Sequence, residues 1–445
     1  MDSSDWPRET VESLIESGAI LGHKDGNYGS FYPRVSEFGS VGVPFLTAKS
    51  ISDGRLNIAG APRLANDRAD TLKFGFIWPN DVLLSHNATV GRVAVVPNFD
   101  GRLLIGTSLT YFRLNPERLS TRYFAAYLTG AEFQNQLAAV MSHSTRNQVP
   151  ITAQRKLTIV VPPLATQEAI AGILGPLDDK IRINRRTSDT NEALARALFK
   201  SWFVDFEPVR AKAEGRDPAL SKEITDLFPN RMVESEIGES PEGWRIGTLR
   251  SAVDLIRENE NPPDSPDAMY SHFSIPAFDN GHLPILERGA AIKSHKFRVP
   301  PGSVLMSKLN PEIERVWLVD VQPGNRAICS TEFLVLRPCL PFGRAYAYCL
   351  ARSPELRREI EGLVTGTSKS HQRAQPNAIL GLAIIKPPSA LIDEFQKIAE
   401  PLLARTLECR RESRTLTALR NVLLPKLISG ELRIKDAEKS IESAA

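Results

Sequence analysis

Residues 79–85, PNDVLLS, recur in a closely similar form as residues 301–307, PGSVLMS. Four further pairs of stretches match in the same order, and the offset within every pair lies between 222 and 225 residues. The pairs are 92–96 with 315–319, 111–116 with 333–338, 122–128 with 344–350, and 159–163 with 384–388. A repeat of this length is too long for a solenoid or a propeller, so it predicts two homologous domains in tandem.

Each repeat has the same coarse pattern. Short β-rich runs come first, and in the first repeat they are residues 82–84, 92–96 and 110–114, separated by Gly, Pro and Asn. A short helix is expected from Arg122 to about Leu137, followed by a polar loop and a strand from Leu157 to Val161. A proline pair then precedes a long helical pattern. Each half is therefore predicted to be an α+β domain followed by a helix.

The two helical stretches have residues at alternating steps of four and three that are mainly apolar towards the ends and polar or small at the centre, which is the coiled-coil spacing. The first set is Ile170, Leu174, Leu177, Ile181, Asn184, Ser188, Asn191, Ala195, Leu198 and Trp202. The second is Phe395, Ala399, Leu402, Thr406, Cys409, Ser413, Leu416, Arg420, Leu423 and Leu427, with Leu419 able to replace Arg420. The shared spacing favours pairing of the two helices with each other. The alternative is that each packs only onto its own domain.

Pro176 and Pro401 occupy equivalent places, and we expect the long straight segments to begin there because proline is tolerated in a first turn. The intervening stretch is rich in Pro, Glu, Lys and Asp and is predicted to be a linker with one short helix. The predicted organisation is a first domain, a first helix, a linker, a second domain, a second helix and a charged tail. Their boundaries are 1–163, 164–204, 205–243, 244–388, 389–434 and 435–445.

Composition excludes several classes of protein. The net charge of +3 over 445 residues excludes a uniformly basic coat, and no apolar run is long enough for a membrane span. The N-terminus has no signal-peptide pattern. The four cysteines, Cys329, Cys339, Cys349 and Cys409, form no CxxC pair, so we expect reduced thiols in a cytoplasmic protein and no metal site.

Sequence motifs for catalysis are absent. The chain has no GxxxxGK[ST] phosphate loop, no HExxH and no GxSxG. Residues 261–264, NPPD, resemble the Asn-Pro-Pro-aromatic motif of amino-methyltransferases, but Asp264 replaces the aromatic residue that stacks on a flipped base. The acidic pair Asp178–Asp179 lies on an amphipathic helix and is interpreted as a solvated face. We expect no catalytic residue.

Four windows contain no acidic residue: 82–99 and 133–167 in the first half, and 288–311 and 362–392 in the second. Phosphates attract Lys and Arg, and base edges pair with Arg, Asn, Gln, Ser and Thr. The windows therefore predict DNA contact, against the alternative of polar surface loops that lack carboxylates by chance. The candidate residues are Ser85, His86, Asn87, Thr89, Arg92, Ser144, Arg146, Asn147, Gln148, Arg155, Lys156, Lys293, Lys296, Ser307, Lys308, Ser368, Lys369, His371, Gln372 and Arg373.

Over essentially its whole length the chain resembles the specificity subunit of a type I restriction–modification enzyme. The resemblance is carried by residues 81–96, 162–181, 191–215 and 419–432, for example LRNVLLPKLISGEL at 419–432. It implies two target-recognition domains, each reading half of a split DNA site. It also implies that the long helices pair antiparallel, separate the domains and dock methyltransferase subunits. The second domain departs from the pattern, since SKLNPEIERV from Ser307 replaces the Ser-x-Asn-x-Thr-x-Gly-type loop of the first.

Antiparallel helices would relate the domains by a pseudo-twofold axis that matches the dyad of duplex DNA. The expected partners are double-stranded DNA, two methyltransferase subunits and restriction subunits where present, and no membrane. The chain itself would hold no cofactor; S-adenosylmethionine, ATP and magnesium are expected only on partner subunits. Two alternatives are a coiled-coil adaptor that does not read DNA and the recognition part of a fused methyltransferase.

The resemblance and the helical spacing together suggest a surface for the other helix or for a partner subunit. Its candidate residues are Leu177, Ile181, Leu194, Leu198, Phe199, Trp202, Phe203, Leu402, Leu416, Leu419, Leu423 and Leu427. The aromatic end of the first helix has more apolar surface than one opposing helix covers. We therefore expect Trp202 or Phe203 to face the methyltransferase or to pack across to Leu423 and Leu427.

Overall fold

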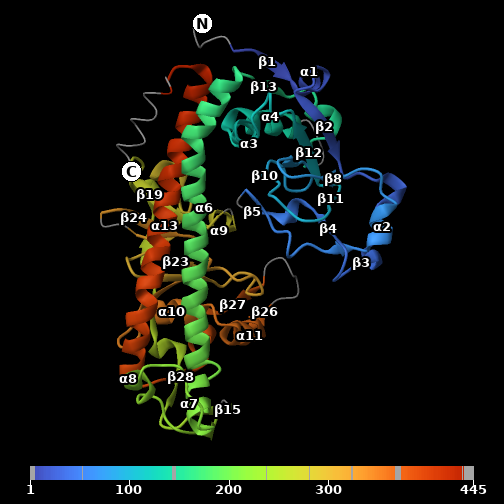
Figure 1. Cartoon of the computed structure of the whole chain (residues 1–445). Coiled ribbons are helices and arrows are strands. Elements are labelled where there is room, and N and C mark those ends of the chain that lie inside the picture. The colour runs from blue at the N-terminus through green and yellow to red at the C-terminus, as the bar shows by residue number, and fades with distance from the viewer. Residues whose placement is uncertain are drawn as a thin grey trace. The chain divides into compact units, whose positions relative to one another are not determined.

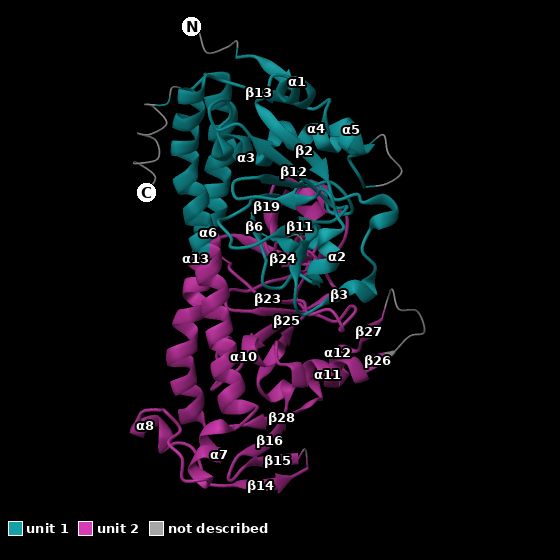
Figure 2. Cartoon of the chain, turned by 45° about the vertical axis from the view of Figure 1, so that its right-hand side comes forward, with its two compact units in different colours: residues 1–184, 412–445 teal, residues 185–411 magenta. Residues whose placement is uncertain are grey.

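The structure of the protein is a computed structural model that describes residues 6–52, 54–142, 147–236, 238–279, 281–321, 324–365, 372–432 and 434. The chain divides into two compact units, one of residues 1–184 with 412–445 and the other of residues 185–411 (Figure 2). We call them unit 1 and unit 2. In the described residues no helix is both long and apolar enough to cross a membrane.

Two long helices contribute to both units (Figure 1). Helix α6 spans Leu164–Phe203 and helix α13 spans Ser389–Ser429. The expectation that the straight segments begin at the prolines is wrong, because α6 starts twelve residues before Pro176 and continues through it. Helix α13 likewise starts before Pro401. Proline removes a single backbone hydrogen bond, and tertiary packing on both sides of the residue offsets that loss.

Unit 1 is built on a four-stranded antiparallel sheet of order β10-β9-β12-β2. These strands are Val93–Val95, Val82–Ser85, Leu109–Leu114 and Ile20–Asp25. A five-stranded sheet of order β3-β7-β4-β11-β8 contains Phe38–Gly39, Arg63–Leu64, Val43–Leu46, Leu103–Ile105 and Phe76–Ile77. Strand β1, Arg8–Thr10, pairs with β13, Thr158–Val160.

The helices of unit 1 cover the four-stranded sheet. The single helix expected after β12 is two, α3 (Thr121–Thr129) and α4 (Ala131–Ser142), separated by Gly130. Phe112 of the sheet and Tyr123 of α3 share a core with Leu174 of α6 and Leu427 of α13. The ends of the long helices are therefore part of the core of unit 1.

Unit 2 contains the corresponding sheets. Its four-stranded sheet has the order β23-β22-β25-β17, formed by Val316–Leu318, Val304–Ser307, Phe333–Pro338 and Val253–Ile256. Its five-stranded sheet, β18-β21-β24-β19-β20, contains Asn259–Glu260, Lys296–Arg298, Arg326–Cys329, Met269–Phe273 and Ile285–Arg288. Strand β16 (Arg245–Thr248) pairs with β28 (Ala383–Lys386), and α10 (Arg344–Ala351) and α11 (Pro354–Gly362) follow β25. The repeated sequences PNDVLLS and PGSVLMS end in β9 and β22, which occupy the same place in their sheets.

Helices α6 and α13 pair antiparallel. In unit 1, Arg420 Nη1 donates to Asp178 Oδ1 at 2.8 Å, and Asn184 Nδ2 donates to Glu412 Oε2 at 2.8 Å. In unit 2, residue 188 contacts residue 406. Rising numbers in α6 meet falling numbers in α13, and the polar seam residues Asn184, Ser188, Cys409 and Ser413 are buried. The predicted coiled-coil contact is confirmed, and packing of each helix only onto its own domain is excluded.

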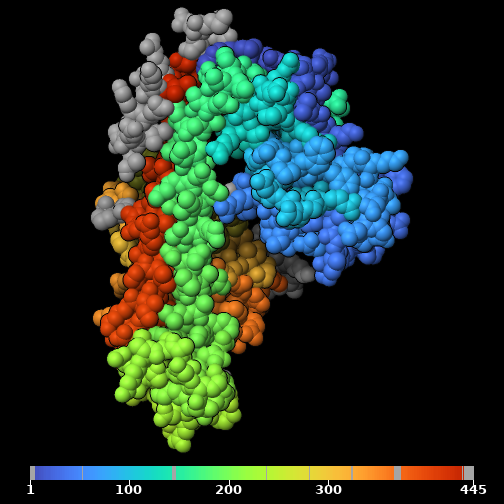
Figure 3. Space-filling model, viewed as in Figure 1, coloured from blue at the N-terminus to red at the C-terminus, as the bar shows by residue number. Residues whose placement is uncertain are grey.

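The linker after α6 has more structure than one short helix. It forms α7 (Glu207–Ala213), α8 (Lys222–Thr225) and a hairpin of β14 (Met232–Ser235) with β15 (Gly238–Pro241). These residues, yellow-green in Figure 3, cover the end of α6, and Phe206, Val209 and Phe228 join the core of unit 2. Apolar side chains in an otherwise polar sequence thus fix the linker to the helix.

The aromatic end of α6 is buried, so the predicted exposed apolar surface there is wrong. Trp202 and Phe203 are 1% and 7% exposed. Both rings pack against Phe395 of α13, with centroids 6.2 and 5.3 Å away. Leu423 and Leu427, the alternative partners expected, belong to a different core cluster in unit 1. In an antiparallel pair the end of α6 meets the beginning of α13, which explains the difference.

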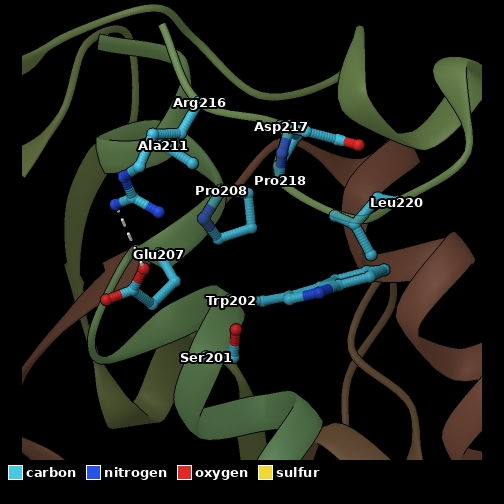
Figure 4. Close-up of a pocket in the computed structure, with 9 residues that line it drawn as sticks. All are labelled: Ser201, Trp202, Glu207, Pro208, Ala211, Arg216, Asp217, Pro218 and Leu220. Carbon is cyan, nitrogen blue, oxygen red and sulfur yellow. Dashed lines mark ion pairs between the residues drawn. The ribbon is translucent and has the colours of Figure 1, made fainter. Parts of the chain in front are cut away.

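The linker also covers the indole of Trp202 from the other side. Pro208 and Leu220 lie over the ring, beside a cavity of about 90 Å³ (Figure 4). Arg216 and Glu207 form an ion pair of 3.8 Å at the rim of this cavity. The tryptophan is therefore held inside unit 2 and is not presented to a partner.

Candidate nucleic-acid interface

Two of the acid-free windows meet in unit 1. The segment after β9 and the segment before α5 (Ile151–Gln154) form an isolated antiparallel bridge between Asn87 and Gln148. Ala88 N donates to Asn147 O at 3.0 Å, and Val149 N donates to His86 O at 2.8 Å. Residues about sixty positions apart in sequence are thus held as one paired edge, which we call loop pair 1 (residues 85–92 and 147–149).

Several predicted contact residues build loop pair 1 from inside. Ser85 is fully buried, and its Oγ accepts a hydrogen bond from Arg92 N at 2.8 Å. The Arg92 guanidinium donates from Nη1 to the carbonyl oxygens of Ala48 and Ile51, at 3.3 and 2.8 Å. Ser85 positions the loop from inside, whereas Arg92 is exposed although its guanidinium is bound to these backbone oxygens.

His86 is also internal. Its imidazole is 1% exposed, and burial lowers the pKa of His86 below its ordinary value. A neutral ring does not attract phosphate, so this residue contributes shape and not charge. The exposed candidates of unit 1 are Thr89, Arg92, Asn147, Arg155 and Lys156, while Asn87 and Gln148 are half-buried.

Unit 2 repeats the arrangement. Leu309 and Arg373 form an isolated antiparallel bridge, and Asn310 N donates to Gln372 O at 2.8 Å. Ala374 N donates to Lys308 O at 3.1 Å. We call this edge loop pair 2 (residues 307–315 and 372–374). Ala88 and Asn310 are the backbone donors at corresponding positions of the two loop pairs. Both have positive φ, 62° and 48°, a conformation that non-glycine residues rarely adopt.

The predicted residues of unit 2 differ in exposure. Ser307 is buried and its Oγ donates to Leu309 O at 3.0 Å. Lys296 is 8% exposed, its Nζ donates to Ser294 O at 3.2 Å, and burial lowers its pKa. Lys293 and Arg373 are exposed, and Lys308 and Gln372 are half-buried. Ser144, Arg146, Ser368, Lys369 and His371 lie outside the described residues.

Glu332 was not among the sequence candidates, although it adjoins loop pair 2. It directly precedes β25, its backbone oxygen accepts from Lys308 N at 3.0 Å, and its carboxylate holds Arg373. In unit 1 the corresponding residue before β12 is Ser108, whose backbone oxygen accepts from His86 N at 3.0 Å. Searching for acid-free stretches misses Glu332 because the sheet, not the sequence, brings it to the loop. The sequence repeat does not find it either, because it matches residues 111–116 with 333–338, whereas the strand pairing sets Leu109 opposite Ser85 and Phe333 opposite Ser307.

The predicted helix and partner residues fall into three classes of exposure. Leu177, Ile181, Phe199, Trp202, Phe203, Leu423 and Leu427 are buried; Leu198, Leu402, Leu416 and Leu419 are half-buried; and Leu194 is 53% exposed. Ile183, eleven residues earlier on α6, is 55% exposed. Ile183 lies on the part of α6 that belongs to unit 1, and Leu194 lies on the part that belongs to unit 2.

In the described residues, no group of three or more His, Cys, Asp or Glu side chains is positioned to hold a metal ion. The four cysteines are unbridged, and burial raises the pKa of Cys329 and of Cys349 to about 12. Such thiols are weak nucleophiles and behave as small apolar side chains.

Comparison with known proteins shows which family the chain resembles. Residues 39–192 match the family described as the type I restriction modification DNA specificity domain. This match includes β9 and both segments of loop pair 1.

The chain is 23% identical over 443 residues to the type I restriction enzyme MjaIX specificity subunit of Methanocaldococcus jannaschii, covering 97% of this chain and 94% of the relative. It is 25% identical over 395 residues to the HindI specificity subunit of Haemophilus influenzae, covering 77% and 84%. The fold is shared with a crystal structure of the type I S subunit from M. genitalium, at a TM-score of 0.52 and 14% identity over 96% of this chain and 97% of the other. The resemblance of the chain to type I restriction–modification specificity subunits is confirmed.

Proposed function

We propose that the chain is the DNA specificity subunit of a type I restriction–modification complex and that each loop pair reads one half of a bipartite site. The observation that carries this proposal is the recurrence of one construction in both units. A strand-end loop is bridged to a distant polar segment, with Asn87 and Gln148 in one unit and Leu309 and Arg373 in the other. Amide and guanidinium side chains are the groups that pair with base edges in the major groove.

The corresponding strand orders support descent of both units from one domain by duplication. Antiparallel pairing of α6 with α13 supports a pseudo-twofold relation between the recognition domains, as a duplex with opposed half-sites requires. Gln148 and Arg373 occupy corresponding bridge positions but differ in chemistry. The two half-sites should therefore differ in sequence.

We further propose that α6 and α13 set the spacing of the half-sites and dock two methyltransferase subunits, with restriction subunits joining where present. The exposed aliphatic side chains of Ile183 in unit 1 and of Leu194 in unit 2 are our candidate contacts for a partner helix. Adenine methylation, and the S-adenosylmethionine it needs, would belong to the partner. In this proposal the chain determines which DNA sequence is bound, and the partner subunit catalyses the methylation.

The proposal is tested by expressing the chain with its methyltransferase subunit in cells and sequencing the methylated adenines. We expect one bipartite motif with a fixed spacer, which disappears when the chain is omitted. A DNA-independent adaptor would give no motif, and the purified complex would then show no salt-dependent binding to a DNA duplex. That result would contradict the proposal.

A further inference from the structure

The two loop pairs differ at a matched pair of positions. Residue 148 in unit 1 and residue 373 in unit 2 are the bridge residues of corresponding segments. Residues 108 and 332 accept the corresponding backbone hydrogen bonds, as described above. Unit 1 thus combines glutamine with serine, whereas unit 2 combines arginine with glutamate.

The carboxylate of Glu332 holds Arg373 by one edge. Arg373 Nε donates to Oε1 and Oε2 of Glu332 at 3.2 and 3.1 Å, and Nη2 donates to Oε1 at 2.8 Å. A guanidinium has five N–H donors in a fixed fork. The edge formed by Nη1 and the second N–H of Nη2 points away from this carboxylate. The side chain of Arg373 is 47% exposed, so the ion pair lies at the surface of unit 2.

The backbone does not need this ion pair to fix the loop. Loop pair 2 is already held by hydrogen bonds from Asn310 N and Ala374 N. An exposed arginine–carboxylate pair contributes little to stability, because solvent screens the attraction and ordering two long side chains costs entropy. What the pair does accomplish is to restrict the rotamers of a long side chain and to aim its remaining fork.

The charge balance also bears on the ligand. Phosphate contact depends on net positive charge, and Glu332 neutralises Arg373. The N7 and O6 acceptors of guanine, in contrast, match the geometry of two parallel N–H donors. An amide, such as that of Gln148, matches the N6 and N7 atoms of adenine in the same way.

We propose that Arg373, oriented by Glu332, is a specificity-determining residue that selects guanine at one position of the half-site read by unit 2. The inference rests on the proposed function of the chain. Glu332 acts through Arg373 and is a positioning residue. Introducing the corresponding residues of unit 1, Gln148 and Ser108, at positions 373 and 332 should change the base that unit 2 prefers.

The test uses the full chain with its methyltransferase subunit and compares four variants by sequencing methylated adenines and by binding to duplexes that differ at one base pair. Arg373→Gln with Glu332→Ser copies the pair of unit 1. Arg373→Lys retains the charge but loses the fork. Glu332→Gln retains the arginine but loosens it. Lys156→Gln, an exposed cation of unit 1, is the matched control.

We expect a guanine in the wild-type motif that the double variant and Arg373→Lys no longer require, with discrimination against other bases falling about 5- to 100-fold at that position alone. Glu332→Gln should lower discrimination by a smaller factor. Lys156→Gln should weaken binding to all sequences equally. The other half-site should be unchanged by every variant.

The proposal is overturned if Arg373→Lys retains the full motif, or if the double variant weakens binding to all sequences alike and lowers the salt slope by about one, since both results describe a phosphate contact. Loss of all activity together with a lowered melting temperature would assign the pair a purely structural role and would also overturn it. Absence of any motif with the wild-type chain would refute the proposed function itself, which is a distinguishable outcome.

Discussion

Ser188 of α6 and Thr406 of α13 exchange hydrogen bonds, each hydroxyl donating to the backbone carbonyl oxygen of the other residue at 3.3 Å. Both residues are buried, at 3% and 0% exposure. Small side chains let the two helix backbones approach, and the reciprocal bonds form only when these residues are opposite each other. The pair therefore fixes the register of the helices within unit 2.

Replacing Ser188 with leucine should destabilise the protein. The larger side chain overpacks the close crossing and removes one of the two bonds, at a cost of about 1–3 kcal/mol. Thr190→Leu, on the exposed side of the same helix, should change stability by less than about 0.5 kcal/mol. Urea unfolding followed by circular dichroism measures both. Equal stability of the two variants would show that the helices do not pack at Ser188.

Glu192 should be the most sensitive charged residue of the helix pair. It is 8% exposed, accepts from Tyr348 Oη at 2.7 Å and from Arg410 Nη2 at 2.5 Å, and also pairs with Arg352. Glu192→Ala leaves two partly buried guanidinium groups without this carboxylate, so we expect a loss of about 3–5 kcal/mol.

The matched control for Glu192 is Glu408→Ala, which removes an exposed pair with Arg405 and should cost about 0.5 kcal/mol or less. Thermal unfolding of the purified variants gives the comparison. If Glu192→Ala is no more destabilising than Glu408→Ala, the buried network does not contribute to the stability of unit 2.

Acid should destabilise unit 1 through His23. Burial lowers the pKa of His23 from 6.5 to about 4, and its Nε2 lies 3.2 Å from Gln154 Oε1. Between these values the unfolded chain binds a proton that the folded chain does not, so stability falls as the pH falls from about 6.5 to 4. The full loss is about 3 kcal/mol.

His23→Gln removes this titration, so the free energy of unfolding of the variant should fall less between pH 7 and pH 4 than that of the wild type. His86 retains a contribution of the same sign, because burial lowers its pKa too. Unfolding in urea at several pH values provides the measurement. Parallel pH profiles for wild type and variant would show that His23 is solvated and titrates normally.

Lengthening the helix pair should lengthen the spacer of the DNA motif. Four residues inserted after Arg186 and four after Arg411 lie between the Asn184–Glu412 and Ser188–Thr406 contacts, so both helices grow at the same level. The insertion adds about 6 Å and little more than one full turn. Methylated motifs should keep both half-sites and gain about one or two base pairs of spacer, at ~3.4 Å each.

A single inserted residue in each helix is the control for the longer insertion. It rotates the apolar face by about 100° and should abolish pairing and activity together. An active four-residue variant with an unaltered spacer would mean that the helices do not set the distance.

The sequence repeat was sufficient to predict the architecture that depends on local pattern. The strands containing residues 82–85 and 304–307 are where the repeat places them, and Asn184 and Ser188 are buried as the coiled-coil spacing requires. Both predictions rest on periodicity, which follows directly from helix and strand geometry.

Tertiary contacts determine what the sequence did not predict. The sequence predicts an exposed Trp202 that could contact a partner, but the linker residues Pro208 and Leu220 cover its ring in the structure. The polar composition of the linker does not predict that packing. Arg92 and Lys296 have the composition of DNA-contacting residues, yet backbone oxygens of neighbouring loops bind both. Composition identifies a polar group but not its partner.

The central claim is that the two recognition domains read their half-sites independently, and exchange of one domain tests it most directly. Residues 1–163 are replaced by the first domain of another specificity subunit, the chimaera is expressed with the methyltransferase, and methylated adenines are mapped across the genome. The account predicts that one half-site changes, while the other half-site and the spacer remain as in the wild type. A motif altered on both sides of the spacer would contradict it.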